Sequence, residues 1–260
     1  MSHALHDRVA LITGGGTGIG RATAEMMAAQ GATVVVAGRR QAPLDEAVAA
    51  IAAAGGPPAA AFTADLADPD SAARLAHDVL AGHGRCDIVV NNAGFSSKVR
   101  NPRYIGADEW RSVMDVNTTG PLVLTRELLP GMIERGYGDV ILVSSMAALR
   151  PGIMAGVAYS AAKVAARFYM DVLREEVRGL GIRCTTVYPG EVDTPILDNR
   201  PLPPGPAERA TMMQSEDIAE AILLACTLPR RATMLDVTIG ATQPRDFTAD
   251  NAAAREKRTP

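Results

Sequence analysis

The chain has 260 residues, of which 47% are hydrophobic and 21% charged, ordinary values for a globular protein that buries a core. A formal net charge of −3 gives no field that would attract nucleic acid or an anionic membrane, so neither partner is expected. No stretch has the roughly 18 uninterrupted apolar residues of a membrane span, and residues 1–7 do not resemble a signal peptide. We therefore expect a cytoplasmic protein.

The three cysteines indicate neither a disulfide framework nor a zinc site. Cys86, Cys184 and Cys226 are odd in number, far apart and in no CxxC arrangement. We interpret them as buried or half-buried thiols in a reducing compartment. No metal site is predicted.

Short apolar runs alternate with helical patterns from the start of the chain. The expected strands are 9–12, 33–37, 59–64 and 87–90. The expected helices are 21–30, 44–54 and one that begins near Asp68 or Asp70 and ends at residue 81.

The alternation continues through the second half of the chain. A long helix is expected to begin at an Asp108 cap and to continue past Asn117 to Leu129, where a Pro-Gly pair breaks the pattern. Further strands are expected at 139–143, 183–188 and 234–239, and further helices at 159–179 and, capped by Ser215, at 216–228.

Apolar strands that alternate with helices predict a parallel sheet covered on both faces. We therefore expect a Rossmann-like, doubly wound α/β fold with three α/β/α layers and about seven strands, in which ligands bind at the carboxyl ends of the strands. Residues 1–260 are expected to form one dinucleotide-binding and catalytic domain. The proline-rich segment 195–205 is expected to belong to a substrate lid near 195–215, and the polar tail 243–260 to be peripheral or frayed.

A glycine-rich turn, TGGGTGIG at residues 13–20, lies between the first expected strand and the first expected helix. Gly14 permits a tight turn, Gly18 lets backbone approach a pyrophosphate, and Gly20 lets the helix pack on the strand. The free N–H groups at the helix N-terminus favour an anion. The pattern predicts a dinucleotide site, with a purely structural turn as the alternative.

The second expected strand ends at Gly38, Arg39 and Arg40, where a fold that binds NAD has an acidic residue for the ribose hydroxyls. Glycine followed by arginine instead opens space for a 2′-phosphate and supplies a cation with several donors. The sequence therefore favours NADP(H), while NAD(H) stays open. The alternative is that both arginines are solvated surface charges.

Tyr159 and Lys163 are four residues apart and lie on one face of an expected helix. A phenol is a weak acid-base catalyst at neutral pH because its ordinary pKa is about 10, and a nearby ammonium lowers that value. The YxxxK pattern also occurs by chance, so the motifs around it decide whether it marks a catalytic site. NNAG at 91–94, the serine pair 144–145 and the Pro-Gly pair 189–190 each follow an expected strand.

Together these motifs resemble those of the short-chain dehydrogenase/reductase superfamily over residues 7–240. The matching segments are TGxxxGxG at 13–20, NNAG at 91–94, YxxxK at 159–163 and PGxVxT at 189–194. The resemblance implies an NAD(P)-dependent oxidoreductase, either a carbonyl reductase or a secondary alcohol dehydrogenase, that acts on a small carbonyl or alcohol. A catalytically silent dinucleotide-binding scaffold stays open, as does an epimerase or dehydratase on the same fold.

The resemblance also implies roles for four residues. Tyr159 would donate a proton to the carbonyl oxygen in reduction, and Ser145 would hydrogen-bond that oxygen. Lys163 would lower the pKa of Tyr159 and hold the nicotinamide ribose, while Asn117 would interrupt its helix and position a proton-relaying water. The interval from Ser145 to Tyr159 is one residue longer than the family spacing, so Ser144 stays open as a substitute.

The same resemblance implies a set of cofactor contacts. Asp65 and Leu66 are expected near the adenine, Asn91 near the adenosine ribose, and the segment from Pro189 to Thr194 at the carboxamide. Asp65 also suits a turn or a helix cap. The full predicted set is Gly14, Thr17, Gly18, Ile19, Gly20, Arg39, Arg40, Asp65, Leu66, Asn91, Ala93, Gly94, Tyr159, Lys163, Pro189, Gly190, Val192 and Thr194.

Three loops, 95–104, 147–157 and 195–209, are expected to select the substrate. Four of their cations, Lys98, Arg100, Arg103 and Arg150, could bind a carboxylate or another anionic group, and the alternative is that they face solvent. The segment 234–239 lacks the glycine pair that ends many acyl-carrier-protein reductases. It is more similar to the branch that includes short hydroxy-acid dehydrogenases.

The resemblance further implies a homotetramer, with a homodimer as the alternative. Members of the family usually associate through two long helices. The alanines of the expected helix 159–179 would permit close packing between subunits: Ala161, Ala162, Ala165 and Ala166.

Overall fold

The computed structural model describes residues 4–257. Within this range seven parallel strands form one sheet, in the order β3-β2-β1-β4-β5-β6-β7. The strands are β1 (Val9–Thr13), β2 (Thr33–Gly38), β3 (Ala60–Thr63), β4 (Ile88–Asn91), β5 (Gly138–Val143), β6 (Ile182–Pro189) and β7 (Asp236–Ile239).

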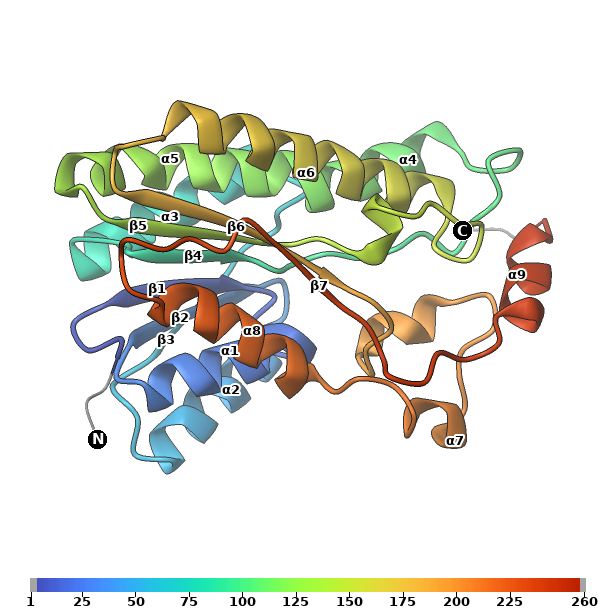
Figure 1. Cartoon of the computed structure of the whole chain (residues 1–260), viewed down its shortest axis with the longest axis horizontal. Coiled ribbons are helices and arrows are strands. Elements are labelled where there is room, and N and C mark those ends of the chain that lie inside the picture. The colour runs from blue at the N-terminus through green and yellow to red at the C-terminus, as the bar shows by residue number, and fades with distance from the viewer. Residues whose placement is uncertain (1–3, 258–260) are drawn as a thin grey trace.

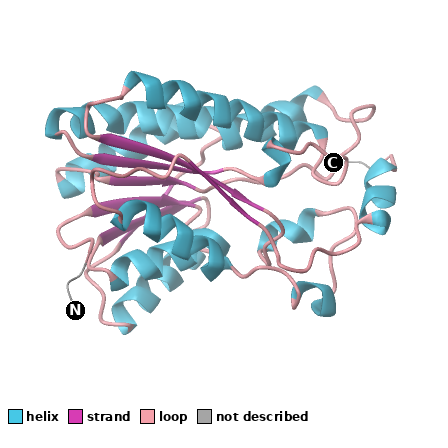
Figure 2. Cartoon of the chain, viewed as in Figure 1, coloured by secondary structure: helices cyan, strands magenta, loops and turns pink. Residues whose placement is uncertain are grey.

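Helices cover both faces of this sheet and give three layers (Figures 1 and 2). Helices α1, α2 and α8 cover one face, α3, α5 and α6 cover the other, and α7 and α9 lie together at one end of the molecule (Figure 1). The helices are α1 (Gly18–Ala29), α2 (Gln41–Ala53), α3 (Pro69–His83), α4 (Ala107–Met114), α5 (Gly120–Arg135), α6 (Val157–Glu176), α7 (Pro206–Arg209), α8 (Ser215–Thr227) and α9 (Thr248–Arg255). The expected Rossmann-like α/β fold is confirmed.

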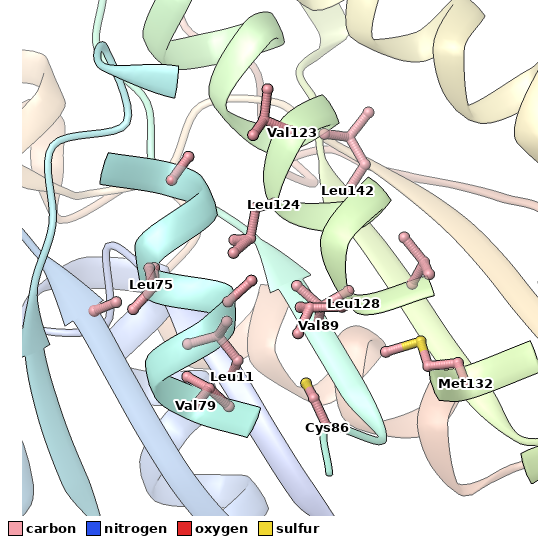
Figure 3. Close-up of a cluster of buried hydrophobic side chains, with 14 of the residues drawn as sticks. Leu11, Leu75, Val79, Cys86, Val89, Val123, Leu124, Leu128, Met132 and Leu142 are labelled. Atoms are coloured by element: carbon pink, nitrogen blue, oxygen red, sulfur yellow. The ribbon is translucent and has the colours of Figure 1, made fainter. Parts of the chain in front are cut away.

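The hydrophobic core has two parts, one on each face of the sheet. Leu11 and Val89 belong to the part packed against α3 and α5 (Figure 3), whereas Ile12 and Val90 belong to the part beneath α1 and α8. Successive side chains of a strand point to opposite faces, so both faces of each central strand are buried. This explains why the strands are continuous apolar runs in the sequence.

Three findings of the structure concern the cysteines, metal binding and membrane spans. Cys86, Cys184 and Cys226 are free and buried, as expected. Within residues 4–257 no group of histidine, cysteine and acidic side chains could hold a metal ion. In the same range no helix is both long enough and apolar enough to cross a bilayer.

The helix expected to end at Leu129 continues to Arg135, with Pro130 inside it. The proline lacks one backbone N–H and therefore removes only one helical hydrogen bond. Leu128 and Met132 on either side of it are fully buried against the sheet, and their burial outweighs that loss. The helix instead ends at Gly136, whose φ of 62° is left-handed.

The N-termini of two helices also differ from expectation. Helix α4 begins at Ala107 with Gly106 at the cap, so Asp108 lies in the first turn. Helix α8 begins at Ser215, and the N–H of the preceding Gln214 donates to Asp217 Oδ2 at 2.8 Å. In both helices an acidic side chain in the first turn complements the helix dipole, and a sequence pattern does not resolve the single-residue shift.

The chain after residue 243 is not frayed over the residues described. It forms α9 and contributes Arg245, whose Nη2 donates to Glu191 Oε1 at 2.8 Å. Asp250 of α9 is buried and lies 3.4 Å from the same Arg245 Nη2. These tertiary ion pairs, which no local pattern signals, hold the polar tail against the body of the protein. Residues 258–260 of the expected tail lie outside the described residues.

Candidate active site

The carboxyl ends of the strands open into a cavity of ≈ 810 Å³. Its walls come from the glycine turn after β1 and from the segments that follow β4, β5 and β6. A smaller hollow of ≈ 200 Å³ shares the glycine turn and continues past the ends of β2 and β3. This is the edge of the sheet at which the sequence predicts the ligands to bind.

The glycine turn needs glycine at the predicted positions. Gly14 and Gly18 have φ angles of 65° and 54°, which side chains rarely adopt. A Cβ at Gly20 would overlap the carbonyl oxygen of Gly14 and the amide nitrogen of Asn92. Thr17 precedes α1 without capping it through its side chain, so the N–H groups of the first helical turn stay available to an anion.

The turn is braced by the segment after β4. Thr13 Oγ1 accepts hydrogen bonds from the N–H groups of Asn92 and Ala93, each at 3.0 Å. Asn92 Nδ2 donates to Thr13 O at 2.9 Å. Asn92 was not among the predicted site residues, although the NNAG motif contains it. The brace fixes the distance between the glycine turn and the rest of the cavity.

The first asparagine of NNAG does not reach the cavity. The Asn91 side chain donates to Thr125 Oγ1 at 2.9 Å, and the residue is 2% exposed. It lines neither hollow, whereas Asn92, Ala93 and Gly94 do. The predicted position of Asn91 near a ribose therefore stays a prediction, and its side chain is not placed to make that contact, because its amide faces α5.

The arginines after β2 lie at the rim of the smaller hollow. Arg39 and Arg40 are exposed and line it. Their guanidinium groups make no hydrogen bond or ion pair with any residue in 4–257. A Cβ at Gly38 would meet only Leu44, at 3.6 Å, so the space beside both arginines is open.

Asp65 and Leu66 also line the smaller hollow. Asp65 Oδ1 accepts from the N–H of Ala67 at 3.0 Å, which is the turn role that the sequence left open. The cap of α3 is Asp68, whose Oδ1 accepts from the N–H of Asp70 at 3.0 Å. Leu66 is buried, and its carbonyl oxygen lies where a Cβ at Gly120 would be.

Tyr159 and Ser145 face the same cavity from different elements. Tyr159 lies in the first turn of α6 and Ser145 directly after β5. Ser145 Oγ accepts from the N–H of Ala147 at 3.1 Å, and this contact fixes the hydroxyl at the start of the short helical turn 146–148. Ser144 Oγ donates to Lys163 O and is buried, so Ser145 is the better placed of the two serines.

The pKa of Tyr159 is raised, chiefly by burial. Its hydrogen bond with Ser145 opposes this, as do the positive charges of Arg100 and Arg200, and these three interactions lower the pKa. We expected the ammonium of Lys163 to be the cation that lowers this pKa. The cations that lower it are Arg100 and Arg200, and the Lys163 ammonium lies 5.6 Å from the centre of the Tyr159 ring.

Lys163 is 3% exposed. Its Nζ donates to Val143 O at 3.0 Å, and a Cβ at Gly94 would lie 3.3 Å from it. Burial lowers the pKa of Lys163 to about 8, because the charged form loses its water. The ammonium therefore lies on the cavity floor, between the ends of β4 and β5.

Asn117 interrupts its helix as expected. The π-helical turn Asp115–Thr119 separates α4 from α5, and such turns are frequent at functional sites. Asn117 Nδ2 donates to Val113 O at 2.8 Å and to Phe95 O at 3.0 Å. Its Oδ1 is buried without a hydrogen-bond partner among the described residues and lies beside Gly94, so a buried acceptor is left for a water or a ligand.

The segment after β6 completes the wall opposite the glycine turn. The Gly190 N–H donates to Ile239 O at 2.8 Å, which ties this segment to β7. A Cβ at Gly18 would lie 3.1 Å from Thr194 Cγ2, so the two walls come close there. The predicted residues Pro189, Gly190, Val192 and Thr194 all line the cavity.

The predicted lid forms ion pairs both with the segment after β6 and with the tail. The pairs with the tail join Arg245 to Glu208 and Arg200 to Asp250. Arg200 and Arg245 both bind Glu191 Oε1, at 2.5 and 2.8 Å. Arg209 of α7 binds Asp193 at 2.8 Å and also Asp198 at 2.5 Å. Segment 195–209 and the tail therefore close one side of the cavity, at the end of the molecule where Figure 1 shows α7 and α9.

The four loop cations that could bind an anion are not equivalent. Lys98 and Arg103 are exposed and do not line the cavity. Arg150 is exposed at its rim. Arg100 is 3% exposed and lines it. The structure thus brings only two of the four to the cavity.

The cavity fits a nicotinamide dinucleotide. The glycine turn has no Cβ atoms where a pyrophosphate must approach, and the first turn of α1 lacks a side-chain cap. The smaller hollow extends from that turn to Arg39 and Asp65, the positions expected for the adenosine end. The ammonium of Lys163 and the unpartnered Oδ1 of Asn117 lie beside Gly94, where polar groups of a ligand can satisfy them.

Comparisons with known proteins agree with this fit. The family model for short chain dehydrogenases matches residues 8–203. An uncharacterized oxidoreductase of Staphylococcus aureus (strain USA300) is 32% identical over 237 residues, which cover 90% of this chain and 97% of the relative. The chain therefore belongs to the short-chain dehydrogenase family and is an NAD(P)-dependent oxidoreductase.

Two solved structures of similar proteins contain NADP. A metagenomic short-chain oxidoreductase in complex with NADP is 32% identical, with a TM-score of 0.80, and the match covers 92% of this chain and 100% of that one. The closed form of a serine dehydrogenase complexed with NADP+ is 27% identical, with a TM-score of 0.82, over 91% of this chain and 96% of that one.

Proposed function

We propose that this protein is an NADP(H)-dependent carbonyl reductase or secondary alcohol dehydrogenase with Tyr159 as its general acid and base. The observation that carries the proposal is that Tyr159, Ser145 and Lys163 line the same cavity as the glycine turn, with Asn117 Oδ1 beside Gly94. A nicotinamide bound there would supply hydride to a carbonyl or accept it from an alcohol.

The residues of this chain would handle the substrate oxygen and its proton. Ser145 Oγ, fixed by the Ala147 N–H, hydrogen-bonds the oxygen as charge develops on it. The Tyr159 hydroxyl gives its proton to that oxygen in reduction and takes it back in oxidation. The positive charges of Arg100 and Arg200 stabilise the phenolate that is left, since both lower the pKa of Tyr159.

Lys163 and Asn117 would act from the cavity floor. The Lys163 ammonium, held by Val143 O, is positioned to donate to the ribose hydroxyls of the cofactor. The buried Asn117 Oδ1 has no partner among the described residues, so it can accept from a water that relays a proton toward that ammonium. Both roles depend on the π-helical turn, which presents the Asn117 side chain at Gly94.

The preference for NADP(H) is part of the proposal. Arg39 and Arg40 have no acidic partner in residues 4–257, and the space beside Gly38 is open. A 2′-phosphate there would accept hydrogen bonds from a guanidinium. Both NADP-bound relatives also support this choice of cofactor.

The expected subunit packing through α6 stays a prediction, with a change in the residues concerned. Ala162 and Ala166 are 0% and 2% exposed and pack in the core, so they cannot form a contact between subunits. Phe168 and Val172 of the same helix are 61% and 66% exposed. We propose that these two residues, together with the half-buried Ala161 and Ala165 of the sequence prediction, form the apolar face through which copies of the chain associate.

The replacement Tyr159→Phe tests the catalytic assignment. It removes the hydroxyl and keeps the ring, so the cavity and its cofactor should be preserved while turnover of ketones and secondary alcohols falls by about 10²-fold or more. The measurement is NADPH oxidation in a carbonyl panel, together with NADPH binding by fluorescence. Tyr137→Phe, at a tyrosine outside the cavity, is the matched control. Turnover close to wild type in the Tyr159 variant, with NADPH bound, would refute the assignment.

A further inference from the structure

Arg100 is a buried arginine at the point where the three substrate loops meet. It lies on the loop after β4 and is 3% exposed. Its Nη1 donates to Ala155 O at 2.8 Å, on the loop before α6. Its Nη2 donates to Ser96 Oγ at 3.0 Å and to Asn199 O, on the lid, at 3.2 Å. All three partners are neutral.

No carboxylate within residues 4–257 forms an ion pair with Arg100. Its Nε is buried and has no hydrogen-bond partner among the same residues. The comparably buried Arg183, by contrast, binds Asp139 at 2.6 Å. A buried charge without an ion-pair partner is costly, and burial together with the nearby Arg200 lowers the pKa of Arg100 to about 10. Such a site gains most from an anion that arrives with a ligand.

The cavity wall around Arg100 is positive. Away from the cofactor-binding residues, its charged lining consists of four arginines and one carboxylate, that of Glu191. Glu191 is already bound by Arg200 and Arg245. Glu109 of α4 is near enough for its charge to raise the pKa of Arg100, but it forms no ion pair with Arg100 among the described residues and instead accepts a hydrogen bond from Ser97 Oγ. Arg100 also lies close enough to Tyr159 for its charge to lower the pKa of that phenol.

We propose that Arg100 binds a carboxylate of the substrate, so that the enzyme acts on oxo acids and hydroxy acids in their anionic form. The inference rests on the proposed function, because it concerns the substrate of the same cavity. The carboxylate accepts from Arg100 Nε and supplies the ion-pair partner that the described residues do not provide. Arg100 is then a binding residue that selects the substrate, with the carbonyl or hydroxyl presented to Tyr159 and Ser145.

A purely structural role makes a different prediction. If Arg100 only ties the three loops together through Ala155, Ser96 and Asn199, its loss damages the cavity for every substrate alike. The ratio of activities toward a charged substrate and its neutral analogue separates the two roles. A general loss of folding or of activity cancels in that ratio.

The experiment uses Arg100→Met in the full-length enzyme with NADPH. Pyruvate, acetoacetate and levulinate are each compared with their methyl esters, and kcat/KM is measured for both members of a pair. We expect wild type to prefer at least one acid over its ester and Arg100→Met to lower that preference by about tenfold or more, mainly through KM. Arg100→Lys, which keeps the charge, should restore part of it. Arg103→Met removes an exposed arginine of the same loop and should leave the preference unchanged.

Binding of the same compounds to the enzyme–NADP+ complex, followed by calorimetry, completes the test. An unchanged acid-to-ester ratio in Arg100→Met, or no preference for any acid in wild type, overturns the carboxylate subsite while the proposed function stands. Binding of an acid that requires Arg100, without reduction of any acid or ester, supports the subsite and overturns the proposed function. Absence of both binding and turnover overturns both.

Discussion

Replacing Lys163 by methionine is expected to make the ligand-free protein more stable at neutral pH. The ammonium is 3% exposed, and burial lowers its pKa from 10.5 to about 8. Folding therefore removes the water of a charged group and returns a single hydrogen bond, to Val143 O. Methionine has a similar length and no charge to bury, so it removes this cost.

The size of the effect follows from the change in pKa. Linkage converts it to a cost of about 3 kcal/mol at pH 7 and about 1 kcal/mol at pH 9.5. Because the pKa is lowered in the folded state, that state binds fewer protons than the unfolded chain, and the free energy of unfolding of wild type rises with pH over this range. Loss of the hydrogen bond to Val143 O offsets about 1.5 kcal/mol. The variant should be about 2 kcal/mol more stable at pH 7 and about equal to wild type at pH 9.5.

Urea unfolding of both proteins without dinucleotide, at the two pH values, measures this difference directly. Other titrating groups contribute equally to both proteins and cancel. Lys98→Met, at an exposed lysine, is the control and should show no pH-dependent difference. A Lys163 variant that is less stable than wild type by the same amount at both pH values would show that the buried ammonium carries no cost. That result would contradict the reasoning.

Two further changes test the adenosine end and the opposite edge of the sheet. Arg39→Ala should weaken NADPH binding about 10- to 100-fold and NADH binding little, because the contact proposed for Arg39 is to the 2′-phosphate. Fluorescence titration with both cofactors measures this, Arg74→Ala on α3 is the control, and equal losses would contradict it. Asp139→Ala should lower the free energy of unfolding by about 3–5 kcal/mol, because it leaves Arg183 buried beside no carboxylate. Urea unfolding measures the loss, Glu175→Ala in an exposed pair is the control, and a similar small change in both would contradict the role of the buried pair.

Most strands of the sheet could be predicted from the sequence because the signals that mark them lie within short segments. Strands buried on both faces are short apolar runs, and the glycines of the first turn mark a backbone that other residues cannot adopt. Gly14, Gly18 and Gly20 all occupy positions where a side chain would be strained or would collide. The alternation with helices then leaves few possible topologies.

The parts that could not be predicted depend on contacts between distant segments. Pro130 breaks a helical pattern in the sequence, but the burial of its neighbours against the sheet keeps the helix intact. The polar tail resembles a frayed end until Arg245 is seen to bind Glu191. No sequence pattern distinguishes Asn91, which faces α5, from Asn92, which braces the glycine turn.

The candidate site shows the same division. Tyr159, Ser145, Lys163 and the glycine turn could be placed together because each lies at the end of a strand or the start of a helix at one edge of the sheet. The environment of each group could not be predicted from the sequence, because the burial and the nearby charges of each group arise from the whole fold. Thus the pKa of Tyr159 is raised, and Arg100, one of four similar loop cations in the sequence, is the one that is buried.

The ion pairs of the tail have a consequence for how this protein can diversify. The outer wall of the cavity includes Pro244, Arg245 and Phe247, and these residues come after the last strand of the sheet has been completed. Substitutions or insertions there would reshape this wall of the cavity while leaving the strands of the sheet and the glycine turn unchanged. Grafting the terminal twenty or so residues between relatives is therefore a practical way to engineer new selectivity on an unchanged scaffold.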